Sequence, residues 1–253
     1  CNRFFRSGSS TACSRYAGAH GSNPLVHAHW LASLLILVCA SQSANAQSSL
    51  NAEYQQALGW IADGRQLLAQ RRFAEAQAQF SRYVNSYPAD PRGFFWLGVA
   101  QDEAGDPAGA LKMYSRSLDD AKDLGMDSAE LRTNLGNTLL KLNYIKEATY
   151  DFKRALEIDP TAIRAHLGLA QTALQTGLMQ DALAQLQTCS EQGFTDPVMP
   201  FLKAKALLGL RRGNEAREQL QLYEHGMIGA SGELISNARA LMQQLPPASQ
   251  QHY

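Results

Sequence analysis

Cys189 and His166 are the two side chains in the main body of this sequence that could carry chemistry. A cysteine is a nucleophile when a base activates it, and a histidine can be that base or can bind a metal. His166 has no second histidine or carboxylate at helical ligand spacing, so we expect a structural histidine with satisfied ring nitrogens. Cys189 falls at a position that Ser117 and Ala155 hold in neighbouring repeats, described below, which favours core packing over catalysis.

Motifs of catalytic and metal sites do not occur in the sequence. It contains no CxxC, HExxH or GxSxG motif and no glycine-rich phosphate-binding loop. We therefore expect no enzyme activity, no cofactor and no metal site. With 45% hydrophobic residues, 18% charged residues and a formal net charge of zero, the composition also argues against a disordered chain and a nucleic-acid partner.

The element that organises the chain is a pair of short amphipathic helices, seen most clearly in residues 129–162. Leu131, Leu135 and Leu139 recur at the spacing of one helical face, and Asp159-Pro160 ends the second helix. Helices this short are marginal in water when isolated. The pair therefore needs neighbours of the same kind, which predicts a repeat.

Three columns of residues recur along the chain with steps of 34, 38, 34 and 34 residues. The columns are Gly64, Gly98, Gly136, Ala170 and Ala204; Ala76, Ala110, Ala148, Ala182 and Ala216; and Phe80, Tyr114, Phe152, Leu186 and Leu220. Because all three columns share the single irregular step, they mark one repeating unit. The four extra residues are expected in a loop near 125–128.

This pattern resembles the tetratricopeptide repeat (TPR) family, whose unit is a 34-residue helix-turn-helix with a small residue in the first helix. In the third unit Gly136, Ala148, Phe152 and Pro160 match the family signature, whereas the fourth and fifth units are identified mainly by spacing. The resemblance implies an all-α, TPR-type right-handed superhelix of about five repeats plus a C-terminal capping helix. The expected units lie near 57–90, 91–124, 129–162, 163–196 and 197–230, with the capping helix at 231–245 and a polar tail at 246–253.

Residues 1–46 have the layout of a secretory signal peptide. Three arginines and no acid precede an apolar run from Trp30 to Ala40, and Ala44-Asn45-Ala46 offers a cleavage site. The run is shorter than the roughly 20 residues of a membrane span. We expect an exported, periplasmic protein that starts at Gln47; an uncleaved anchor and lipidation of Cys39 are the alternatives, and Val38 disfavours the second.

The chain begins at Cys1 and its first methionine is Met113, so the leader itself is expected to start near Leu25 or Val26. After cleavage only Cys189 remains, so no internal disulfide can form. Removing the three leader arginines from the 23 basic residues leaves 20 against 23 acidic residues, a net charge of −3. Contact with a membrane is expected only through the leader, if it stays uncleaved or is lipidated.

In the TPR family the first helices of successive units line a concave groove, and the resemblance places a binding face on those helices here. The predicted partner-binding residues are Arg65, Phe95, Val99, Asn137, Leu167, Gln171, Phe201 and Lys205. The alternative is that Phe95, Leu167 and Phe201 fill gaps between helices. Some family members clasp a C-terminal carboxylate with lysine and asparagine, and Phe95 and Val99 on this face disfavour that mode.

The leader and the repeats together predict an exported scaffold that binds a protein or peptide segment and serves cell-envelope assembly. Two alternatives stay open. One is a membrane-tethered assembly factor, lipoprotein or signal-anchored, of a secretion or pilus machine. The other is a regulatory fragment associated with an enzyme.

Overall fold

The computed structural model describes residues 24–226, 236 and 240–243, with side chains from Gln47 onward. The chain divides into two compact units, Cys1–Tyr54 and Gln55–Tyr253. Helix α1 (Pro24–Ala69) starts in the first unit and ends in the second. None of the described helices is both long enough and apolar enough to cross a membrane.

The first helix of the first repeat has no separate start within the described residues. Helix α1 runs through Ser48 and Ser49 without a break. The physical reason lies in its composition, because neither glycine nor proline occurs between Leu25 and Leu58 to stop a helix. Pro24 stands at the first helical position, where a missing N–H costs nothing.

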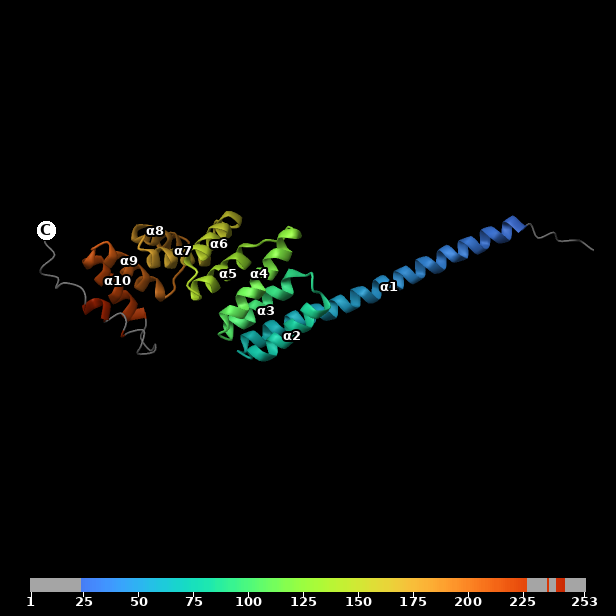
Figure 1. Cartoon of the computed structure of the whole chain (residues 1–253), viewed down its shortest axis with the longest axis horizontal. Coiled ribbons are helices and arrows are strands. Elements are labelled where there is room, and N and C mark those ends of the chain that lie inside the picture. The colour runs from blue at the N-terminus through green and yellow to red at the C-terminus, as the bar shows by residue number, and fades with distance from the viewer. Residues whose placement is uncertain (1–23, 227–235, 237–239, 244–253) are drawn as a thin grey trace, which may run out of the picture. The chain divides into compact units, whose positions relative to one another are not determined.

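Nine further helices follow in the described part of the second unit. Their bounds are α2 Phe73–Ser86, α3 Pro91–Glu103, α4 Pro107–Asp123, α5 Ala129–Lys141, α6 Ile145–Ile158, α7 Ile163–Thr176, α8 Met179–Glu191, α9 Val198–Gly209 and α10 Gly213–Gly226. Consecutive helices pack on each other, and Figure 1 shows them stacked in chain order. Contacts also link α3 to α5, α5 to α7 and α7 to α9, so the first helices of successive repeats form one layer. The predicted all-α TPR superhelix is confirmed.

The column of small residues is a packing column. A Cβ added at Gly136 would lie 2.7 Å from Cε1 of Phe152, and one added at Gly98 would lie 2.9 Å from Cδ1 of Tyr114. Glycine therefore occurs where the second helix presents an aromatic ring, because the ring occupies the space of a side chain. In the fourth and fifth repeats alanine occurs instead and shares its core cluster with a leucine.

The turn inside each repeat contains a residue with left-handed backbone. Arg71, Gly105, Asn143, Gly177 and Arg211 have φ between 60° and 86° and follow the same 34, 38, 34 and 34 steps. Only two of the five are glycine, although this conformation is unfavourable for other residues. The repeat thus fixes a backbone conformation at this position more strictly than a residue type.

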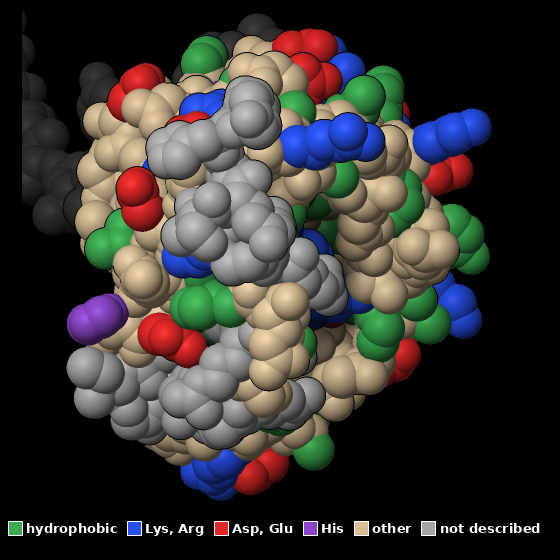
Figure 2. All heavy atoms as spheres, turned by 90° about the vertical axis from the view of Figure 1, so that its left-hand side faces the viewer, with side chains coloured by type: hydrophobic (Ala, Val, Ile, Leu, Met, Phe, Trp, Pro, Cys, Tyr) green, Lys and Arg blue, Asp and Glu red, His purple; other side chains and the backbone are tan. Residues whose placement is uncertain are grey.

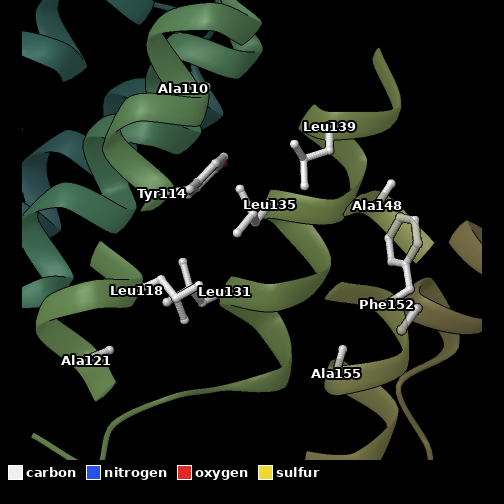
Figure 3. Close-up of a cluster of buried hydrophobic side chains, with 11 residues drawn as sticks. Ala110, Tyr114, Leu118, Ala121, Leu131, Leu135, Leu139, Ala148, Phe152 and Ala155 are labelled. Carbon is white, nitrogen blue, oxygen red and sulfur yellow. The ribbon is translucent and has the colours of Figure 1, made fainter. Parts of the chain in front are cut away.

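A continuous core joins consecutive repeats. In Figure 3 Tyr114 and Leu118 of α4 point toward Leu135 and Leu131 of α5, while Phe152 of α6 lies on the far side of α5. These five side chains are buried or nearly so. The core therefore covers α5 from both sides.

The four extra residues of the irregular step lie between α4 and α5 and are tied down by Arg132. Arg132 is buried, with 3% of the residue exposed. Its Nη2 is 2.7 Å from Oδ2 of Asp127 in the inserted segment, and its Nη1 is 2.7 Å from Oδ1 of Asp151 on α6. Burial raises the pKa of Asp151, and the hydrogen bond from Arg132 only partly opposes this effect. The buried cation of Arg132, on α5, thus links the insertion to α6.

The described part of the predicted capping helix is helical, at residues 236 and 240–243. Leu241 and Met242 pack against the core cluster of α9 and α10 that contains Ala204, Leu220 and Tyr223. The rest of residues 231–245, including Ala238, and the tail at 246–253 lie outside the described residues.

Candidate functional site

The layer of first helices encloses a hollow of about 560 Å³, which we call the groove. Asn134, Asn137 and Lys141 on α5 stand three and four residues apart, the spacing of one helical face. On α7, Leu174 and Gln175 stand three and four residues after Gln171, on one face of that helix. The complete lining is Asp102 and Glu103 of α3, Asn134, Asn137, Leu140 and Lys141 of α5, Arg164, Gln171, Leu174 and Gln175 of α7, and Leu202 and Lys205 of α9.

Charge is distributed unevenly along the groove. At the α3 end, Nζ of Lys141 lies 2.8 Å from Oδ2 of Asp102 and links the second repeat to the third. The other oxygen of Asp102, Oδ1, is buried and has no hydrogen-bond partner among the described residues. Toward α7 and α9, Arg164 and Lys205 are exposed, and no described carboxylate forms an ion pair with either. This end of the groove is therefore positive.

The groove offers side chains that can form hydrogen bonds and ion pairs with a ligand. Four amide side chains, Asn134, Asn137, Gln171 and Gln175, line it. Each amide offers both a donor and an acceptor, the pair that an extended backbone presents. Leu140, Leu174 and Leu202 supply apolar contacts between them. Arg164 and Lys205 would attract an acidic group on the ligand.

Of the eight predicted partner-binding residues, three line the groove: Asn137, Gln171 and Lys205. Arg65 is exposed, with its guanidinium carbon 4.8 Å from the centre of the Trp96 ring. Val99 and Leu167 are half-buried and pack against core clusters instead.

The two predicted aromatic residues pack between helices. The Phe95 ring centre lies 6.0 Å from that of Tyr114 and 5.1 Å from that of Trp96. The Phe201 ring centre lies 5.2 Å from that of Tyr223. Neither phenylalanine lines the groove, so the gap-filling alternative describes their contacts.

Several groove residues were missed by sequence reasoning, among them Asn134, Lys141, Arg164 and Gln175. A usable signal existed for two of them, because Asn134 and Lys141 stand three and four residues from Asn137 on the same helical face. Arg164 lies in the first turn of α7, whereas Gln171, the predicted residue of this helix that lines the groove, lies near its middle. It also lines a neighbouring hollow between α5 and α7, together with Asn134.

The two chemically capable side chains are structural. Cys189 is fully buried, its Sγ lies 3.7 Å from the carbonyl oxygen of Ile163, and burial raises the pKa of its thiol. The ring nitrogens of His166 lie 2.7 Å from Oε1 of Gln185 and 3.1 Å from the carbonyl oxygen of Pro160. Over the described residues, no three histidine, cysteine or acidic side chains are grouped so that they could hold a metal ion. Acidic and basic side chains are interspersed on the face drawn in Figure 2.

Fold and groove define a helical repeat protein of the kind that binds other proteins. Two family models described as tetratricopeptide repeat match residues 61–125 and 139–205. The human tetratricopeptide repeat protein 21B is 28% identical over 113 residues, which are 44% of this chain and 9% of that protein. The chain belongs to the tetratricopeptide repeat family.

Solved TPR structures superimpose on most of the chain. YrrB, described as a TPR protein with an unusual peptide-binding site, has a TM-score of 0.57 and 19% identity over 73% of this chain and 92% of its own. Pseudomonas aeruginosa pilF has a TM-score of 0.60 and 18% identity over 74% of this chain and 87% of its own. At these identities the likeness establishes the fold.

Proposed function

We propose that this chain is an exported scaffold that binds a segment of a partner protein in the groove and serves the assembly of the cell envelope. A role in protein–protein interaction follows from the TPR fold. The groove is the observation that carries the finer proposal, because it spans four repeats and is lined by four amide side chains and, at one end, by Arg164 and Lys205.

The chemistry of the groove favours a peptide with an extended backbone and an acidic group. The amide side chains match backbone N–H and C=O groups, and the positive end at Arg164 and Lys205 favours a carboxylate. The likeness to YrrB, described as having a peptide-binding site, supports a peptide ligand. The proposal is a binding role rather than catalysis.

Reversing the charge of the positive end tests the groove. We expect Arg164→Glu combined with Lys205→Glu to weaken capture of partners from an envelope fraction by about tenfold, because two attractive charges become repulsive. Lys146→Glu combined with Lys153→Glu makes the same charge change on exposed positions of α6 and should leave capture unchanged. Quantified pull-downs and thermal melts of both double variants decide the matter; equal capture by both would refute a role for the groove.

Export is proposed from the leader. We expect the N-terminus of protein recovered from the periplasm to be Gln47, because Ala44 and Ala46 are the small residues that a signal peptidase requires. N-terminal sequencing and mass spectrometry measure it. A start within residues 1–46 would contradict cleavage at this site, and a lipid on Cys39 would favour the membrane-tethered assembly factor.

A further inference from the structure

A second surface feature lies where the four extra residues are inserted. Two adjoining hollows of about 270 and 440 Å³ share Pro91, Arg92 and Met126 as lining residues. We call the pair the loop hollow. Phe95 and Trp96 of α3 also line the smaller part. No residue of the loop hollow lines the groove.

The insertion leaves large apolar side chains exposed at the loop hollow. Leu124 is 57% exposed and Met126 is 48% exposed, and both line the larger part. A turn between two helices needs no such residues, since polar residues and glycine serve there. Exposed apolar surface that adjoins an apolar hollow marks an interaction site more often than an isolated exposed leucine does. The flexible thioether of methionine also adapts to different apolar partners.

The segment around the loop hollow is acidic. Residues 119–130 contain five acidic residues and one lysine. Arg132 engages Asp127, Arg116 pairs with Asp120 and Lys122 pairs with Asp119. Asp123 and Glu130 are exposed and form no ion pair with another described residue. Glu130 is itself part of the lining.

The one arginine of the lining does not offset this charge. Arg92 lies against Asp90, with Nη2 2.5 Å from Oδ2. Partial burial tends to raise the pKa of Asp90, but hydrogen bonds from Arg92 and Tyr83 outweigh this effect and hold the pKa below its ordinary value. Asp90 therefore stays ionised near neutral pH and compensates Arg92. The rim of the loop hollow has a net negative field.

We propose that the loop hollow is a second docking site, which takes one large apolar side chain, aromatic or aliphatic, from a basic segment of a partner protein. The smaller part falls below the roughly 300–1,000 Å³ of small-molecule pockets, which suits a single side chain. The acidic rim selects lysine and arginine beside the anchor by charge complementarity. The loop hollow shares no lining residue with the groove, so the two surfaces can be altered by separate substitutions.

The test uses the full chain and three fluorescein-labelled helical peptides. The first is a lysine-rich amphipathic peptide with one central tryptophan; the second has alanine in place of tryptophan, and the third has glutamate in place of every lysine. Fluorescence anisotropy measures each affinity. We expect binding of the first peptide to exceed that of the other two by about tenfold, as for loss of an anchor worth roughly 1.4 kcal/mol.

Two double variants locate the peptide. Leu124→Ser combined with Met126→Ser should weaken binding of the tryptophan peptide about tenfold, and Asp123→Lys combined with Glu130→Lys should weaken it and flatten its salt dependence. The control is Leu178→Ser combined with Leu222→Ser, which removes two leucines that are 55% and 58% exposed on other repeats. That control should bind like the unmodified chain.

Three results would overturn the proposal. If the control variant weakened binding of the tryptophan peptide equally, the peptide would be adhering to exposed apolar side chains in general. Loss of binding in the Arg164→Glu and Lys205→Glu variant, with the loop variants unaffected, would place the peptide in the groove. A dimer in sedimentation velocity that dissociates on Leu124→Ser and Met126→Ser would show that a second copy of this chain covers the loop hollow.

Discussion

Replacing Arg132 with methionine is expected to lower the free energy of unfolding by about 3–5 kcal/mol. The change removes the only cation that contacts Asp151 within hydrogen-bond distance among the described residues and leaves two carboxylates facing each other. Asp151 is 6% exposed, so water cannot replace the lost partner. Urea unfolding followed by circular dichroism measures the effect.

A surface pair and a compensating change provide the controls for Arg132. Arg116→Met breaks the pair with Asp120, but Arg116 is 56% exposed, so we expect a loss of at most about 1 kcal/mol. Adding Asp151→Leu to Arg132→Met should recover most of the lost stability, because the remaining Asp127 is partly exposed and can turn to water. If Arg132→Met and Arg116→Met had equal midpoints, the buried cation would not hold the insertion in place.

Gly136→Leu is expected to cost about 3 kcal/mol, the upper part of the range for overpacking. Even a Cβ at this position approaches Phe152 to 2.7 Å, and Phe152 is fully buried, so the ring has nowhere to move. Lys146→Ala on the exposed side of α6 should change the free energy of unfolding very little. Urea melts compare the two variants, and equal midpoints would mean that residue 136 is not a packing position.

A double-mutant cycle extends this test to the pairing of small and large residues. Gly136→Ala alone should destabilise in spite of the higher helix propensity of alanine, whereas Gly136→Ala in a Phe152→Leu background should be tolerated better. The fourth and fifth repeats already use this combination. Additive effects in the cycle would contradict direct packing of the two positions.

The sequence predicted those parts of the fold in which packing restricts residue type. Glycine at 64, 98 and 136 leaves room for an aromatic ring from the second helix. The small-residue column and the aromatic column could therefore be recognised by residue identity. The turn position with left-handed backbone could not be recognised from the sequence, because Arg71, Asn143 and Arg211 adopt this conformation without being glycine. The continuity of α1 follows from its composition, because no glycine or proline stands between Leu25 and Leu58 to end the helix.

The candidate site was predictable only in part. Asn137, Gln171 and Lys205 lie beside the small-residue column and were predicted from the TPR resemblance, which places a binding face on the first helices. Phe95 and Phe201 lie on similar positions, but a ring on a helix face can turn toward a neighbouring helix as easily as toward solvent, and periodicity does not distinguish the two. The ion-pair network of Arg132 joins the insertion to α6 and becomes visible only when the helices are placed in space.

Site-specific photo-crosslinking tests the central claim, that the groove binds the partner. A photoreactive amino acid replaces Asn137 or Gln171 in the groove in two variants, and Lys146 or Lys153 on α6 in two others. Irradiation in cells followed by mass spectrometry identifies the crosslinked protein. The groove account predicts that both groove positions crosslink to the same partner and that neither position on α6 does. Crosslinks from positions 146 and 153 without any from 137 and 171 would contradict it.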